Sequence, residues 1–166
     1  EGNLLLPVAV VLTAIISLAM YLFWYRPAAP VPVRNCDADA APAVDWSGCS
    51  LPGRSLGRAD LREANLGGAI LARADLHAAN LLRADLRQAN LEAADLHGAS
   101  LREARLSGAV LRGANLELAD LRDADLGFVI LEGARLSGAK LDGARLGFAV
   151  WNDGRVCAAD SIGECR

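Results

Sequence analysis

Leucine stands at every fifth position of this chain twenty times in succession, from Leu51 to Leu146. Alanine stands two residues before these leucines from Ala59 to Ala149, and Val129 is the single substitute in that run. A period of five matches neither the 3.6 residues of an α-helical turn nor the alternation of a simple strand. The pattern therefore predicts a backbone that repeats its own geometry every five residues, as a narrow coil filled by leucine and alanine.

The position between alanine and leucine is most often Asp or Asn, as in Ala59-Asp60-Leu61. Over residues 49–151 the chain resembles the pentapeptide-repeat family, whose motif is A-(D/N)-L-X-X. The resemblance implies an all-β solenoid, a right-handed quadrilateral β-helix with four pentapeptides per coil and with Leu and Ala pointing inward. Such repeats bury their apolar face only by stacking on neighbours. We expect about five coils over residues 51–151, each rising about 4.8 Å.

The N-terminal part has a different pattern, because residues 4–25 carry no charge. A helix of that length spans a bilayer core, and it ends in the aromatic run 21–25 followed by Arg26, as at a membrane interface. We predict an N-terminal transmembrane α-helix within residues 1–26 that contacts lipid through residues 4–25. The alternative is a cleaved signal peptide, which has a shorter apolar core. Residues 27–35 contain three prolines and predict a semi-rigid spacer.

The four cysteines fall into two close pairs outside the repeats, Cys36 with Cys49 and Cys157 with Cys165. Their spacings do not match the Cys-x2-Cys spacing of zinc sites, and each pair can close a small loop. We predict two disulfides, which indicate an oxidising compartment. The alternative is four unpaired buried thiols.

Two signals bear on membrane orientation, and they disagree. Arg26 and Arg34 follow the predicted span, and the positive-inside tendency would place the repeats in the cytoplasm. The cysteines favour an oxidising compartment. We expect a single-pass protein of the bacterial inner membrane with the repeat domain in the periplasm.

Both ends of the solenoid need caps, because they would otherwise expose strand edges and an apolar cross-section. We assign the N-terminal cap to residues 36–50, with Trp46 as a lid on the first coil. We assign a disulfide-pinned C-terminal cap to residues 152–166. Trp151 takes the position of the next leucine.

The charge balance excludes several classes of function. The net charge is −3, and residues 50–150 carry 13 basic and 13 acidic side chains. A nucleic-acid surface is usually strongly basic, so we expect no nucleic-acid partner. The chain has no phosphate loop or nucleophile elbow, and a filled coil leaves no internal cleft. We therefore predict no enzymatic activity, no catalytic residues and no cofactor.

Four repeats per coil place residues twenty apart above one another. His77 and His97 stack in this way; two imidazoles could share a metal ion, but we predict two solvated histidines and no metal site. Opposite charges also stack, and we predict ladders that stabilise the coil register. These ladders are Asp85, Arg105, Asp125 and Arg145; Asp120 and Lys140; and Glu63, Arg83 and Glu103.

One column is apolar where the motif favours Asp or Asn. It contains Ile70, Asn90, Val110, Ile130 and Val150, and Phe128 stacks below Phe148 around one corner. An exposed apolar patch of this kind marks an interface. We predict a partner interface formed by Val110, Phe128, Ile130, Phe148 and Val150. The alternative is that the C-terminal tail or the N-terminal linker covers the patch.

These features together predict a non-enzymatic, membrane-anchored interaction or scaffold module that docks through an outer face of the β-helix. The anchor suggests an accessory or assembly subunit of an integral membrane protein complex. Some pentapeptide-repeat proteins inhibit topoisomerases such as DNA gyrase by mimicking DNA, so the resemblance implies that function as the alternative. Self-association through the Phe128–Phe148 patch, giving a homo-oligomer, is a third possibility.

Overall fold

The computed structural model describes Tyr21 and residues 35–166. The chain divides into two units, Glu1–Val33 and Arg34–Arg166, and all of the fold described below belongs to the second. The predicted membrane anchor and the spacer lie outside the described residues, apart from Tyr21 and residue 35. Among the described residues, no helix has the length and apolar character needed to cross a membrane.

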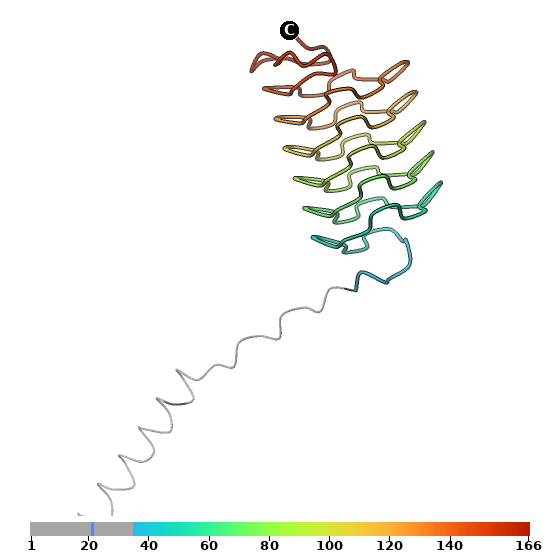
Figure 1. Cartoon of the computed structure of the whole chain (residues 1–166). Coiled ribbons are helices and arrows are strands. Elements are labelled where there is room, and N and C mark those ends of the chain that lie inside the picture. The colour runs from blue at the N-terminus through green and yellow to red at the C-terminus, as the bar shows by residue number, and fades with distance from the viewer. Residues whose placement is uncertain (1–20, 22–34) are drawn as a thin grey trace, which may run out of the picture. The chain divides into compact units, whose positions relative to one another are not determined.

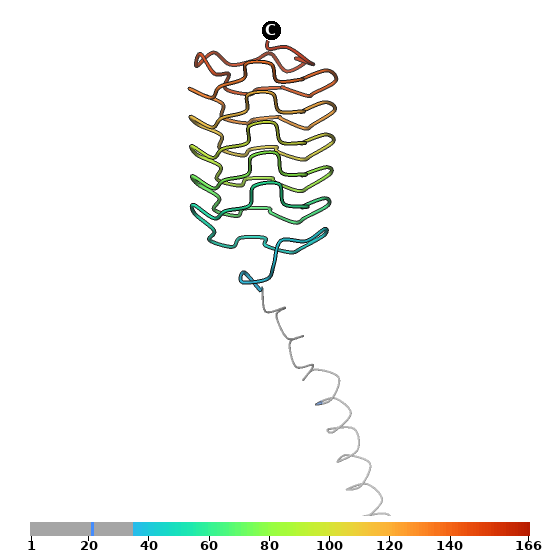
Figure 2. The ribbon, with the colours of Figure 1, turned by 90° about the vertical axis from the view of Figure 1, so that its right-hand side faces the viewer.

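Residues 35–166 wind into stacked coils, as Figures 1 and 2 show. This range contains no helix and no continuous strand; single bridged residues recur at every fifth position instead. Each is paired in parallel with the residue twenty positions further on, from Asp45 with Asn65 to Ile130 with Val150. A coil therefore has four bridged positions, one on each of four walls.

Each part of the five-residue motif has a hydrogen-bonding role. The leucine N–H donates to the coil above, as from Leu91 to the Val110 carbonyl at 2.7 Å, and the next alanine N–H closes a tight turn, as from Ala94 to the Leu91 carbonyl at 3.0 Å. The Asp or Asn side chain accepts the N–H at the start of the corner, as Asp95 Oδ1 does from His97 at 3.0 Å. This local bond explains the preference for Asp and Asn before leucine.

The interior is the leucine and alanine column that the sequence predicts. From Leu61 to Leu116 every leucine and alanine of the motif is fully buried. Stacking makes these side chains one continuous core along the coil axis. Recognition by this part of the chain is therefore confined to the outer walls and the corners.

The N-terminal end differs from the predicted cap. Coil pairing begins at Asp45, before the expected boundary, and Trp46 occupies an inward leucine position with 0% exposure. It is not a lid. The Arg54 guanidinium lies 4.7 Å from the Trp46 ring centroid and donates from Nη1 to the Cys36 carbonyl at 2.8 Å. The segment around Cys36, joined to Cys49 by a disulfide, therefore lies against the first coil.

At the C-terminal end the chain reverses direction and pairs with the last coil. Val150 pairs with Val156 and Arg145 with Ile162, both in antiparallel fashion. The second disulfide joins Cys157 to Cys165. The tail covers only part of the last coil, because partly exposed side chains remain on its other walls: Leu136, Ala139 and Leu141.

Candidate docking face

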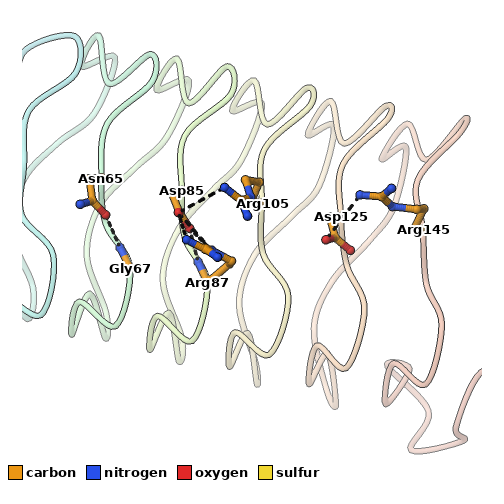
Figure 3. Close-up of polar contacts among 7 residues, drawn as sticks. All are labelled: Asn65, Gly67, Asp85, Arg87, Arg105, Asp125 and Arg145. Carbon is orange, nitrogen blue, oxygen red and sulfur yellow. Dashed lines mark hydrogen bonds and ion pairs between the residues drawn. The ribbon is translucent and has the colours of Figure 1, made fainter.

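One wall carries the charged row, which we define as Asn65, Asp85, Arg105, Asp125 and Arg145. Figure 3 shows its side chains and their partners. Arg105 Nη1 lies 3.8 Å from Asp85 Oδ2, and Arg145 Nη2 lies 3.5 Å from Asp125 Oδ2. The alternating signs thus bring charges together across neighbouring coils, as the sequence predicts for these two pairs.

The shorter ion pairs were missed by the sequence reasoning, because they lie within one repeat. Arg87 Nη2 is 2.5 Å from Asp85 Oδ2, and Arg122 Nη2 is 2.6 Å from Asp120 Oδ2. The hydrogen bonds from these arginines hold the pKa of each carboxyl below its usual range. Asp120 therefore makes its ion pair with Arg122, whereas the sequence predicted Lys140. The recurring Asp-Leu-Arg triplet was the available signal.

Other corners carry charge pairs between coils. Arg83 Nε donates to Glu103 Oε2 at 2.9 Å, as the third predicted ladder requires. Arg112 Nε donates to Glu132 Oε2 at 3.2 Å, a pair that the sequence reasoning did not single out. These side chains are about half exposed, so each pair contributes only about 0–1 kcal/mol to stability.

The two histidines have separate carboxylate partners. His77 Nδ1 lies 2.6 Å from Asp75 Oδ1, while the His97 backbone N–H donates to Asp95 Oδ1 at 3.0 Å. Among Tyr21 and residues 35–166 there is no group of three or more His, Cys, Asp or Glu side chains that could hold a metal ion.

The wall one repeat further along the chain carries the apolar row: Ile70, Asn90, Val110, Ile130 and Val150. Consecutive members pair in parallel from coil to coil. None of them is charged, whereas each of the other three walls carries ionised side chains. Ile70 is exposed, and the valines and Ile130 are partly exposed.

A pair of aromatic side chains borders the apolar row. Phe128 and Phe148 stack with ring centroids 5.2 Å apart and planes inclined by 18°. They remain 62% and 50% exposed. We call the apolar row together with this phenylalanine pair the docking face; it contains all five residues of the predicted interface.

The phenylalanines occupy a corner position where the backbone is left-handed. The φ angles are 58° at Phe128 and 59° at Phe148. The same position of other coils holds Gly48, Gly68, Gln88 with a φ of 57°, and Gly108. Left-handed backbone is unfavourable for bulky L-residues and natural for glycine. Neither burial nor backbone preference therefore accounts for aromatic residues at these two corners.

The apolar row also lacks the corner bond that the motif provides. Asn90 Oδ1 accepts the Glu92 N–H at 3.0 Å, whereas Ile70, Val110, Ile130 and Val150 have no side-chain acceptor. Several other positions in the coils also lack Asp or Asn. Three of them use an arginine that makes an ion pair instead: Arg105, Arg135 and Arg145. Valine and isoleucine make no such replacement contact.

The C-terminal tail continues the apolar row and does not cover it. Val156 pairs with Val150 as the next rung and is itself 62% exposed. Both phenylalanines stay exposed beside it. The structure therefore contradicts the tail half of the self-covering alternative; the linker half concerns residues outside the described range.

A shallow recess lies on the same corner, on the N-terminal side of the phenylalanine pair. Its volume is about 450 Å³, and residues from three neighbouring coils line it: Asn65, Gly67, Gly68, Asp85, Arg87, Gln88 and Ser107. The recess lies toward the charged row, because Asn65 and Asp85 line it and no member of the apolar row does.

Comparison with known proteins identifies the class. A model of pentapeptide repeats matches residues 55–92, 89–127 and 119–150. The chain belongs to the pentapeptide-repeat family, whose fold is the right-handed quadrilateral β-helix predicted from its motif. None of the curated proteins compared with the chain matches it.

Solved structures give the same fold. The pentapeptide-repeat protein Rfr23 from the cyanobacterium Cyanothece 51142 is 33% identical, with a TM-score of 0.56 over 64% of this chain and 90% of that one. QnrB1, a plasmid-mediated fluoroquinolone resistance protein, is 22% identical, with a TM-score of 0.53 over 65% of this chain. The chain covers 63% of QnrB1, and at that identity the likeness establishes the fold alone.

Proposed function

We propose that the protein is a non-enzymatic interaction module, anchored in the bacterial inner membrane, that binds another protein through the docking face. The supporting observation is the uncharged row bordered by the exposed, stacked Phe128 and Phe148. Exposed apolar patches of this kind mark interaction surfaces. With a predicted anchor at residues 4–25, an accessory or assembly subunit of a membrane protein complex fits best.

A charge placed in the docking face tests this proposal. Ile130→Asp and Phe148→Asp should each abolish co-purification of the partner from detergent-solubilised membranes, because a buried unpaired carboxylate opposes association. Leu118→Asp is the matched control, since Leu118 is 60% exposed at another corner with a φ of 59°. All three variants should keep the circular dichroism spectrum of the parent. Unchanged co-purification with Ile130→Asp and Phe148→Asp would refute the docking face.

Membrane topology needs a separate measurement. Cys36, Cys49, Cys157 and Cys165 form disulfides at the two ends of the coils. After reduction in intact cells with the outer membrane permeabilised, a reagent that cannot cross the inner membrane should label them if the repeats are periplasmic. Labelling only after cell lysis would place the repeats in the cytoplasm and contradict this part of the proposal.

The same labelling experiment bears on topoisomerase inhibition, the alternative that the family suggests. That function requires a cytoplasmic domain that imitates the charge of DNA. The balance of 13 basic and 13 acidic side chains over residues 50–150 argues against it. Inhibition of DNA gyrase supercoiling by the purified chain would favour the alternative directly.

A further inference from the structure

We infer that the docking face binds a second copy of this chain, in an antiparallel dimer with its twofold axis between the coils of Val110 and Ile130. The inference rests on the proposed function, because it names an occupant for the face already proposed as an interface. Three observations support a second copy: the spacing of the apolar side chains, the shape of the phenylalanine corner, and the charges along the other border.

The spacing of the apolar row favours a partner with the same coil spacing. Its members recur on successive coils, which are hydrogen-bonded at strand spacing, so the side chains form a straight ladder with steps of about 4.8 Å. Two faces with this step can pack with every rung engaged, as sheets do when they stack face to face. A second copy has this step and carries no charge in the row.

The antiparallel register then matches the rungs by size. Val110 of each copy lies opposite Ile130 of the other, and this contact occurs twice because the interface is isologous. Val150 lies opposite Asn90, whose Oδ1 already accepts the Glu92 N–H. Ile70 lies opposite Val156, the rung that the C-terminal tail adds to the row.

In this register the phenylalanine pair of one copy lies opposite the N-terminal part of the same corner in the other copy. Phe128 lies opposite Gly108 of the second copy, and Phe148 lies opposite Gln88. Gly108 has no side chain to obstruct the ring. Gln88 and the neighbouring Arg87 line the recess of about 450 Å³, where a guanidinium can contact an aromatic face. Gly108 therefore leaves room for the Phe128 ring of the second copy, and the Phe148 ring lies near the Arg87 guanidinium.

The opposite border of the face supplies charge complementarity. Arg112 and Glu132 form an ion pair within one chain, with Nε and Oε2 3.2 Å apart. In the antiparallel dimer Arg112 of each copy also faces Glu132 of the other, which gives two further attractive pairs. A parallel, in-register dimer would instead place the Phe128 ring beside the Glu132 carboxylate. The charges therefore select the antiparallel arrangement.

Charge-reversal variants of the full chain in mild detergent test this pairing. Arg112→Glu leaves only acidic side chains at these two positions, and Glu132→Arg leaves only basic ones. Each variant alone should dimerise at least ~10-fold more weakly, because attraction becomes repulsion at two contacts. An equimolar mixture should recover an affinity within ~3-fold of the parent in sedimentation velocity. Arg83→Glu, which breaks the comparable Arg83–Glu103 pair on another corner, should change nothing.

Cysteine cross-linking tests the register independently. A mixture of chains carrying Val110→Cys and chains carrying Ile130→Cys should form mixed disulfide dimers under mild oxidation. Each variant alone should cross-link poorly, because its new thiols lie on different coils of the two copies. Efficient cross-linking of Val110→Cys with itself would overturn the antiparallel register.

The outcomes separate this inference from the proposed function. A chain that stays monomeric up to ~100 μM, well above the micromolar dissociation constant expected of a small face, overturns the second-copy inference. If Ile130→Asp still abolishes binding to another protein, the docking face itself stands. A chain that dimerises equally well with and without Ile130→Asp overturns the inference, because its dimer uses another surface. If Ile130→Asp also leaves every other partner bound, the proposed function fails as well.

Discussion

The charged row and the apolar row stand on identical backbones but differ in what their side chains do. Both are parallel ladders with one residue per coil, and each member is followed in the chain by a buried leucine except Val150, which Trp151 follows. In the charged row the side chains contact each other and the corners of their own chain, as with Asp85, Arg87 and Arg105. In the apolar row the side chains expose hydrocarbon and lack the Asp or Asn corner bond at four coils.

This difference separates residues that serve the coil from residues that serve recognition. The coil is held by backbone hydrogen bonds and inward side chains, which are the same beneath both rows. An outward position can therefore change without loss of the fold. A partner interface is therefore expected where a departure from the motif adds no contact that stabilises the coil.

The largest expected effect tests whether the buried core, and not the side chains of the apolar row, stabilises the coils. Leu101→Ala removes a fully buried side chain in the middle of the core and should lower the free energy of unfolding by about 3 kcal/mol. Val110→Ala removes a partly exposed one and should cost less than about 1 kcal/mol. Denaturant unfolding of both variants measures the contrast. Equal losses would mean that the apolar row belongs to the core.

The next effect concerns the tail that ends the apolar row. Removing the Cys157–Cys165 disulfide with two serines should lower stability by about 2 kcal/mol, because the closed loop is short. Hydrogen exchange should accelerate at the Leu146 and Cys157 amides, which donate to Ser161 and Ala149. The Leu91 amide in the middle coils should keep its protection. Acceleration at Leu91 would show that the coils unfold as one unit with the tail.

The sequence was sufficient to predict the coil because its signal is local and repeated. Leucine at every fifth position fixes which side chains are buried, and the spacing of twenty fixes which residues stack. Residues standing in the apolar row could therefore be identified without coordinates. The ends were less predictable: Trp46 occupies an inward position of the repeat although it is not a leucine. The position of the C-terminal tail depends on contacts outside the repeat.

Side-chain pairing was only partly predictable for a physical reason. A long arginine side chain can reach a carboxylate on a neighbouring coil or a carboxylate two residues away in its own repeat. The spacing of twenty residues predicts only the first kind of pair. Arg122 contacts Asp120 within its own repeat, so the expected Asp120–Lys140 pair was wrong. Arg145 has no acidic residue two positions away and contacts Asp125 on the coil below instead. Arg105 follows Glu103 by two positions, but Glu103 pairs with Arg83, and Arg105 contacts Asp85 on the coil below.

A smaller effect is expected from a substitution that gives the apolar row a side chain typical of the motif. Val110→Asn restores a side-chain acceptor for the Arg112 N–H, in the manner of Asn90 with Glu92. The new hydrogen bond offsets the lower strand preference of asparagine, so stability should change by less than about 1 kcal/mol. Association through the docking face should nevertheless weaken, as measured by sedimentation velocity. A loss above about 2 kcal/mol of stability would show that the valine serves the coil.

The smallest effect is the response to acid of two ion pairs, one of them in the charged row and one on another wall. The pKa values of Asp85 and Asp120 are lowered in the folded chain, chiefly by hydrogen bonds from Arg87 and Arg122. The unfolded chain therefore binds protons more readily, and the stability from these pairs is present above about pH 4 and lost as the pH falls through the lowered values. Arg87→Gln and Arg122→Gln should each reduce, by less than about 1 kcal/mol, the loss of unfolding free energy between about pH 4 and pH 2. Urea denaturation at several pH values measures this loss. Val110→Asn should leave the slope unchanged, because the apolar row has no group that titrates in this range. An equal flattening by Val110→Asn would mean that the two rows are coupled through the coil.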